Sequence, residues 1–201
     1  MAEHFGDIEE VPGSSPGPPT TPSRKSNMND AIAIIGVDAA RLMVEEPLNA
    51  GLISIRDDYG DPHVYSDITK LARQNMDGLL VLHFDDIDAP HDGFQVPQMH
   101  HVKRALAFAR KHPHVIVHCT AGISRSSAIA LMIAYDRLRD VDAAKAILDC
   151  VRHFPNRIVV GLGEELFGVD FGLYAQDPRI SDQIQFTERE IEPLLDERAD
   201  K

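Results

Sequence analysis

The 201-residue sequence contains only two cysteines, Cys119 and Cys150. Two cysteines do not make a disulfide scaffold, so we expect a reducing intracellular setting and predict a cytoplasmic location. No apolar run approaches the length of about 18 residues that a membrane-spanning helix needs, so no membrane insertion is expected. The N-terminus lacks the basic and apolar regions of a signal peptide, and none is predicted.

Positive charge is also scarce, because 20 Lys and Arg residues face 32 Asp and Glu residues and the formal net charge is −12. A surface of this sign repels nucleic acid and anionic membranes, so neither is an expected partner. Any phosphate group that the protein binds must therefore be captured by local groups. The composition, with 43% hydrophobic residues, is ordinary for a globular protein and leaves the oligomeric state open.

The two ends of the chain differ in composition from its middle. Residues 1–27 hold five of the 13 prolines and have little to bury, which predicts a disordered tail rich in Pro and Ser. Residues 177–201 are expected to form an acidic C-terminal extension with an amphipathic or frayed helix. One domain is predicted between them, over residues 28–176.

Within that domain, apolar runs of strand length alternate with segments of helical spacing. Strands are predicted over 31–35, 51–57, 78–84 and 114–119, and helices over 37–46, 66–75, 97–109, 126–139, 142–154 and 157–168. Ser66 and Asp142 are expected to cap their helices, and Cys150 is expected to lie on a buried helix face. The alternation predicts an α/β fold, with a central, mainly parallel sheet flanked by helices.

The stretch HCTAGISRSS at 118–127 lies between a predicted strand and an almost continuously apolar helix. A tight turn that opens a helix directs backbone N–H groups inward and adds the positive end of the helix dipole, which together bind an anion. Arg125 adds a planar fork that can hold two phosphate oxygens. The other expected substrate-binding residues, mostly small, are Thr120, Ala121, Gly122, Ile123 and Ser124. We call residues 119–125 the phosphate loop.

Cys119 lies at the base of this loop and is predicted to be a nucleophile. The dipoles that bind phosphate also stabilise a thiolate, which can attack phosphorus in line and form a cysteinyl-phosphate. Ser126 can donate a hydrogen bond to the sulfur and help it to leave when the intermediate is hydrolysed. Cys119, Arg125 and Ser126 are therefore predicted catalytic residues.

The arrangement of His118, Cys119, five further residues, Arg125 and Ser126 resembles the signature of the cysteine-based protein tyrosine phosphatases. The SRS at 124–126, followed by an apolar helix, is most similar to the dual-specificity branch. With its upstream FxDIxxP pattern, the chain also resembles compact bacterial tyrosine-phosphatase-like proteins. The resemblance covers roughly residues 30–168 and implies a phosphatase domain over 28–176 that uses no metal or other cofactor.

The resemblance also implies a general acid, which is an Asp on a mobile loop about thirty residues before the cysteine. The segment FDDIDAP at 84–90 follows a predicted strand and offers Asp85, Asp86 and Asp88. Asp86 is the predicted acid because it matches the Asp of the FxDIxxP pattern. Asp85 and Asp88 remain alternatives, since a loop easily absorbs one residue.

Two more residues receive roles from the resemblance. Asn156, in the segment PNR, is expected to support the phosphate loop through a hydrogen bond to its backbone. His118 is expected to orient Cys119 through hydrogen bonds. The ten histidines do not show the spacing of an HExxH motif or of a Cys/His quartet, so no metal site is predicted.

The expected substrate is a phosphorylated protein, with phosphotyrosine hydrolysed and phosphoserine or phosphothreonine as further targets. The chain has no tryptophan and therefore lacks the Trp-Pro-Asp loop of the larger tyrosine-specific enzymes. Phosphoinositides and RNA 5′ ends are alternative substrates, although the loop has no lysine and the surface is acidic. A phosphate-binding module with little catalysis and a sulfurtransferase are competing interpretations of the same loop.

Overall fold

The computed structural model describes residues 31–58 and 60–174. The predicted tail at 1–27 and the predicted extension at 177–201 lie outside these residues. The described strands are β1 (Ile32–Ile35), β2 (Leu48–Arg56), β3 (Met76–His83) and β4 (Val115–His118). The described helices are α1 (Val37–Met43), α2 (Pro62–Asn75), α3 (Met99–Ala109), α4 (Arg125–Leu138), α5 (Val141–Lys145) and α6 (Arg157–Phe167).

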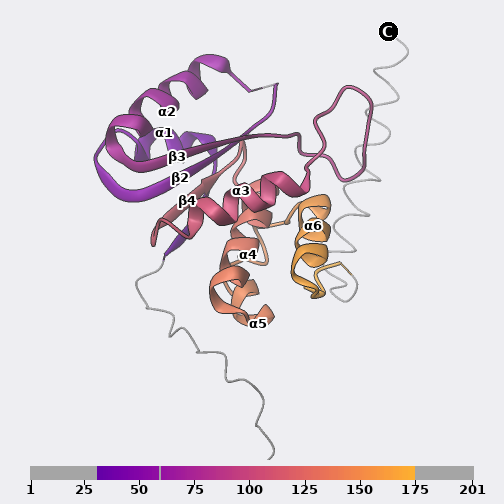
Figure 1. Ribbon diagram of the computed structural model, residues 1–201. Coiled ribbons are helices and arrows are strands. Elements are labelled where there is room, and N and C mark those ends of the chain that lie inside the picture. Colours follow the sequence, from indigo (N-terminus) through magenta and orange to yellow (C-terminus); the bar gives the residue numbers. More distant parts are fainter. Residues whose placement is uncertain (1–30, 59, 175–201) are drawn as a thin grey trace, which may run out of the picture.

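The four strands form one parallel sheet in the order β1-β4-β2-β3 (Figure 1). In the register of the sheet, Val117 of β4 pairs with Ile34 on one side and with Ile53 on the other. The predicted α/β fold with a parallel sheet is confirmed. Because parallel strands end at the same edge, the segments that follow β2, β3 and β4 meet there, and this edge carries the phosphate loop.

Helices cover both faces of the sheet (Figure 1). Alternate strand residues point to opposite faces, so Leu52 and Ile116 pack with Ala40 of α1 and Ile68 of α2. The next residues along the strands pack in the larger core with helices α3, α4 and α6. Residues 128–135 of α4 are all buried, which agrees with the apolar sequence that predicted a central helix.

Helix α2 begins at Pro62, four residues before the predicted cap Ser66. The carboxylate of Asp61 accepts a hydrogen bond of 2.8 Å from the His63 backbone N–H, and Pro62 fits the first helical position because that position needs no N–H donor. The prediction of Ser66 as the cap is wrong, since this serine lies within the helix.

The predicted helix over 142–154 is also wrong in extent, because α5 ends at Lys145. Asp140, instead of Asp142, caps it by accepting a hydrogen bond of 2.9 Å from the Ala143 backbone N–H. Beyond α5, the Asp149 side chain accepts a hydrogen bond of 2.9 Å from the Val151 N–H, a local turn that competes with helix. Cys150 is therefore exposed, and its prediction as a core residue is wrong.

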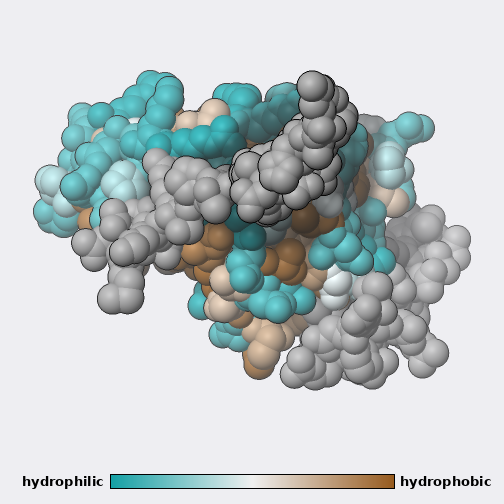
Figure 2. Space-filling view, turned by 60° about the horizontal axis from the view of Figure 1, so that its bottom comes forward, coloured by the Kyte–Doolittle hydropathy of each residue, from teal (hydrophilic) through white to brown (hydrophobic). Residues whose placement is uncertain are grey.

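The surface is mostly polar, with a few exposed apolar side chains. Figure 2 shows one face on which hydrophilic residues dominate the upper part and hydrophobic residues gather near the centre. Across the described residues, the exposed large apolar side chains are Leu42, Met43, Leu48, Phe94, Ile123 and Val151. None of the helices in the described ranges combines the length and hydropathy that a membrane crossing requires.

Helix α6 packs against α4 through a close contact at Gly163. A Cβ atom built at Gly163 would lie 1.8 Å from the Sδ atom of Met132, whose side chain is fully buried. Two residues earlier on the same helix, Gly161 is exposed, and a Cβ there meets nothing within 4 Å. The two glycines therefore offer a matched pair for testing this contact.

We expect Gly163→Ala to lower the free energy of unfolding by about 1–3 kcal/mol, because Met132 has no room to yield. Gly161→Ala should raise it by about 0.5–1 kcal/mol, because alanine favours the helix over glycine. Urea unfolding followed by circular dichroism measures both. Equal stabilisation by the two substitutions would contradict the close packing of α4 and α6.

Candidate active site

The phosphate loop leaves the carboxyl end of β4 and runs directly into α4. Its backbone is held against the segment between β1 and α1, where the Val37 N–H donates a hydrogen bond of 3.0 Å to the Thr120 carbonyl. Gly122 has a φ of 75°, and a Cβ there would lie 2.4 Å from the Gly36 backbone nitrogen. Only glycine fits this position, so the small residues of the loop allow it to pack closely on Gly36.

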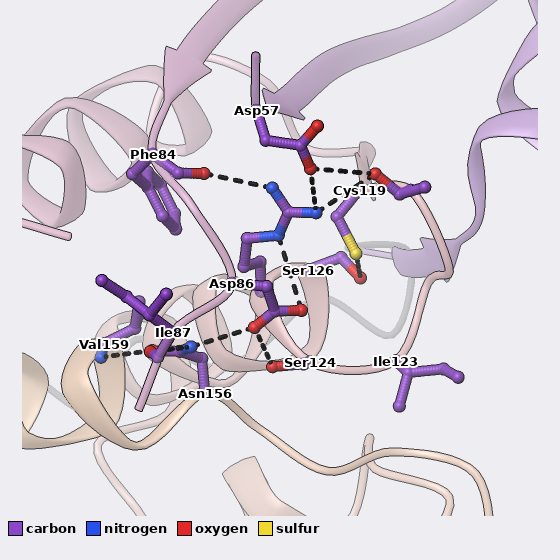
Figure 3. Close-up of polar contacts among 12 residues, drawn as sticks. Asp57, Phe84, Asp86, Ile87, Cys119, Ile123, Ser124, Ser126, Asn156 and Val159 are labelled. Atoms are coloured by element: carbon purple, nitrogen blue, oxygen red, sulfur yellow. Dashed lines mark hydrogen bonds and ion pairs between the residues drawn. The ribbon is translucent and has the colours of Figure 1, made fainter. Parts of the chain in front are cut away.

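Cys119 lies inside the loop, with 1% of its surface exposed. The Gly122 N–H donates to Sγ at 3.3 Å. Ser126 Oγ also lies 3.3 Å from Sγ (Figure 3). Helix α4 begins at Arg125, so the sulfur faces the positive end of the helix dipole. A backbone N–H, a hydroxyl group and the helix N-terminus can therefore all stabilise negative charge on this sulfur.

His118 is fully buried at the end of β4, just before the cysteine. Its burial lowers the pKa of the imidazole to about 4, so the ring is neutral near pH 7. Neither ring nitrogen makes a hydrogen bond within the described residues. The neutral ring lies next to the Cys119 backbone, which partly offsets the effect of burial on its pKa, and its orienting role stays a prediction.

Arg125 is buried, with 3% of its side chain exposed, and its guanidinium group is held by several acceptors. Nη1 donates to the Phe84 carbonyl at 3.1 Å, and Nη2 donates to Thr120 Oγ1 at 3.1 Å. Nη2 also lies 2.7 Å from a carboxylate oxygen of Asp57. Among the residues that the structure describes, Nε has no hydrogen-bond partner, and it lies 3.6 Å from Oδ2 of Asp86. The Nε–H of this buried guanidinium group is thus left to donate to a bound oxyanion.

Asp57 is a site residue that the sequence analysis missed. It follows β2, and its carboxylate accepts hydrogen bonds from Thr120 Oγ1 at 3.3 Å and from the Gly60 N–H at 2.9 Å, besides its ion pair with Arg125. A charge at the end of a buried strand was visible in the sequence. Its partner was not, because only the strand order places β2 beside β4.

Of the three candidate acids, Asp86 is the one whose carboxylate reaches the phosphate loop. Its Oδ1 accepts a hydrogen bond of 2.6 Å from Ser124 Oγ (Figure 3). Asp85 is buried and accepts a hydrogen bond of 2.6 Å from the Gln95 N–H, which ties together the loop between β3 and α3. Asp88 is exposed, and within the described residues no hydrogen bond or ion pair involves it.

Asn156 joins the phosphate loop to the loop between β3 and α3. Its backbone N–H donates to the Ser124 carbonyl at 3.2 Å, and its Nδ2 donates to Asp86 Oδ1 at 3.0 Å and to the Ile87 carbonyl at 2.9 Å. Its Oδ1 caps α6 by accepting a hydrogen bond of 3.2 Å from Val159. The side chain thus contacts the segment that carries Asp86, and the backbone makes the contact to the phosphate loop.

The site offers donors for an oxyanion and carboxylates around it. In the described part of the chain, no group of three or more His, Cys, Asp or Glu side chains is arranged to hold a metal ion. Cys119, Arg125, Asp86 and Ser126 lie together, although they come from two distant segments of the sequence. Ile123, at the outer side of the phosphate loop, is 37% exposed.

No family model and no curated protein matches the chain. It is similar to a structure of PTPMT1 in complex with PI(5)P, with 17% identity and a TM-score of 0.47 over 69% of this chain and 94% of that one.

Two further structures are similar to this chain. Tk-PTP in its active form has 14% identity and a TM-score of 0.38 over 72% of this chain and 84% of that one. The human tyrosine phosphatase-like serine/threonine/tyrosine-interacting protein has 18% identity and a TM-score of 0.39 over 59% of this chain and 76% of that one. At these identities and TM-scores the likeness is distant and does not by itself tell what the chain binds.

Replacing Asn156 tests whether its side chain holds the loop that carries Asp86. In Asn156→Ala, the carbonyl of Ile87 and the N–H of Val159 lose their partners, so we expect a loss of about 1–3 kcal/mol in stability. Amide hydrogen exchange of residues 85–95 should also become faster.

Asn156→Asp is the matched control, because it keeps the cap of α6 but lacks the amide donor and faces the Asp86 carboxylate. It should speed exchange in residues 85–95 at least as much as Asn156→Ala, while α6 stays protected. Unchanged exchange in residues 85–95 of both variants would contradict the role of Asn156 in this loop.

Proposed function

We propose that the protein is a cysteine-dependent phosphomonoester hydrolase that acts on phosphotyrosine, with phosphoserine and phosphothreonine as further substrates. The observation that carries this proposal is the convergence of a buried Cys119 sulfur, the Arg125 guanidinium and the Asp86 carboxylate on one loop. A nucleophile, an oxyanion ligand and a group able to transfer protons are the parts that phosphoryl transfer through a covalent intermediate needs.

In the first step the Cys119 thiolate attacks the phosphorus atom. A bond between sulfur and phosphorus forms while the bond between phosphorus and the leaving oxygen breaks, and the protonated carboxyl group of Asp86 gives its proton to that oxygen. Arg125 Nε, which has no hydrogen-bond partner among the described residues, can donate to a phosphoryl oxygen. Asp86 must be protonated at this stage, because a carboxylate 3.6 Å from Nε would repel that oxygen.

In the second step a water molecule attacks the cysteinyl-phosphate. The Asp86 carboxylate accepts a proton from this water, a new bond between oxygen and phosphorus forms, and the bond between sulfur and phosphorus breaks. The sulfur leaves as a thiolate, whose charge the Gly122 N–H and the Ser126 hydroxyl can stabilise at 3.3 Å each. Inorganic phosphate is released and the enzyme returns to its starting state.

The surroundings of the loop favour a phosphorylated protein side chain over a phosphoinositide or an RNA end. Residues 120–124 contain no lysine or arginine that could bind a second phosphate group. The exposed Ile123 offers an apolar contact beside the loop for the ring of a phosphotyrosine. A phosphate-binding module with little turnover is the competing function in another class.

Turnover of a small aryl phosphate without added metal tests the proposal. We expect hydrolysis that vanadate blocks, no turnover in Cys119→Ser, and a burst of the phenol product when rapid mixing resolves the cysteinyl-phosphate. Tight binding of a phosphopeptide by the wild type without any release of phosphate would instead establish the binding module. Formation of thiocyanate from thiosulfate and cyanide would indicate a sulfurtransferase.

Replacing Asp86 tests the assignment of the general acid. We expect Asp86→Asn to lower kcat by about 10²–10⁴-fold, and the decline of kcat at high pH should disappear, because an amide cannot deliver a proton. Asp88→Asn is the matched control on the same loop and should retain near wild-type kcat. A large loss in Asp88→Asn with an active Asp86→Asn would contradict the assignment.

A further inference from the structure

The mouth of the site is bordered by carboxylates from two loops. Asp57 and Asp58 follow β2, and Asp86 follows β3. Both strands end at the edge of the sheet from which β4 enters the phosphate loop. Asp58 lies next to the second of these loops, since its Oδ2 is 3.4 Å from Gln95 Nε2. Asp57, Asp58 and Asp86 therefore lie close to the phosphate loop, two of them in contact with Arg125.

Little positive charge balances these carboxylates. Arg125 is buried and already contacted by Asp57 at 2.7 Å and by Asp86 at 3.6 Å. Arg56, beside Asp57 in the sequence, donates to Ser54 Oγ at 2.9 Å and to Thr69 Oγ1 at 2.7 Å, so it is directed along the sheet and α2. The side of the site formed by the loops after β2 and β3 is thus negative.

Two arginines lie in the segment around Asn156, whose side chain contacts Asp86 and Ile87 of the loop after β3. Arg152 and Arg157 come from the segment around Asn156, and the Arg157 guanidinium lies 5.0 Å from the centre of the Tyr174 ring. Asp58, which follows β2, is exposed and makes no ion pair within the described residues.

We propose that the site selects phosphorylated peptides that carry lysine or arginine next to the phosphorylated residue, and that Asp58 binds that cationic side chain. This inference rests on the proposed function. Two observations on the described residues point to such a substrate. The Nε of the buried Arg125 has no hydrogen-bond partner among these residues and can donate to the phosphate. The exposed carboxylate of Asp58 has no cationic partner among them and can bind a lysine or arginine. An inositol phospholipid in an anionic bilayer would meet repulsion at the same side.

Paired phosphotyrosine peptides test this inference. The two peptides differ only in carrying lysines or glutamates on both sides of the phosphotyrosine. We expect kcat/KM to be at least about tenfold higher for the lysine peptide at low ionic strength, and the ratio to shrink as salt screens the charges. Asp58→Lys should lower this ratio several-fold or reverse it.

Asp77→Lys is the matched control for Asp58→Lys. It changes the net charge by the same amount, but Asp77 is an exposed residue near the start of β3, at the opposite edge of the sheet. We expect this control to leave the ratio of the two peptides near that of the wild type. An equal effect of both variants would show that overall charge decides, and would overturn the role of Asp58.

Further arms separate this inference from the proposed function. Equal kcat/KM for both peptides, preference for the glutamate peptide, or hydrolysis of a phosphatidylinositol monophosphate in phosphatidylcholine vesicles as fast as that of the lysine peptide would overturn the selectivity. If no substrate is turned over, the proposed function fails. Binding of the two peptides by Cys119→Ser then still decides the selectivity, because it requires no chemistry.

Discussion

The buried guanidinium group of Arg125 is the charge around which this site is arranged. A cation with 3% of its side chain exposed must find acceptors, because burying an unpaired charge is costly. Its acceptors are the Phe84 carbonyl at the end of β3, Asp57 at the end of β2 and Thr120 in the phosphate loop. One side chain thereby connects the ends of three strands.

This requirement explains why the site lies at one edge of the sheet. Parallel strands deliver their carboxyl ends to the same edge, so three loops distant in sequence can share one cation. Helix α4 starts at that cation and directs its N-terminus toward Cys119. This geometry neutralises Arg125 in the free protein and also positions the Cys119 sulfur. Within the described ranges it leaves the Nε of Arg125 without a hydrogen bond.

The carboxylates that accompany Arg125 have a second consequence. Asp57 and Asp86 neutralise the guanidinium before any phosphate arrives, so a dianionic substrate enters a site with little net attraction. Protonation of Asp86 lowers that repulsion and is also what its proposed role as an acid requires. The proposed preference for cationic peptides follows from the same balance, since the substrate has to bring the positive charge that the site lacks.

Local signals in the sequence were sufficient for part of this site. Cys119, Arg125 and Ser126 could be named because they are separated by fixed spacings within one turn, and Asp86 could be named because its loop resembles the FxDIxxP pattern. Asp85, Asp86 and Asp88 could not be separated by spacing alone. Only Asp86 of the three accepts a hydrogen bond from Ser124 among the described residues. This contact depends on how the loop after β3 packs against the phosphate loop.

The sequence by itself determined the alternation of strands and helices, the phosphate loop and the buried character of α4, because these depend on neighbouring residues and on periodicity. Only the tertiary structure decided that Asp57 belongs to the site, that the Asn156 side chain contacts the segment of Asp86, and that Cys150 is exposed. These facts depend on strand order and on where a helix ends. Asp57 lies 68 residues before its partner Arg125, and no local pattern or periodicity of the sequence can reveal a contact over that distance.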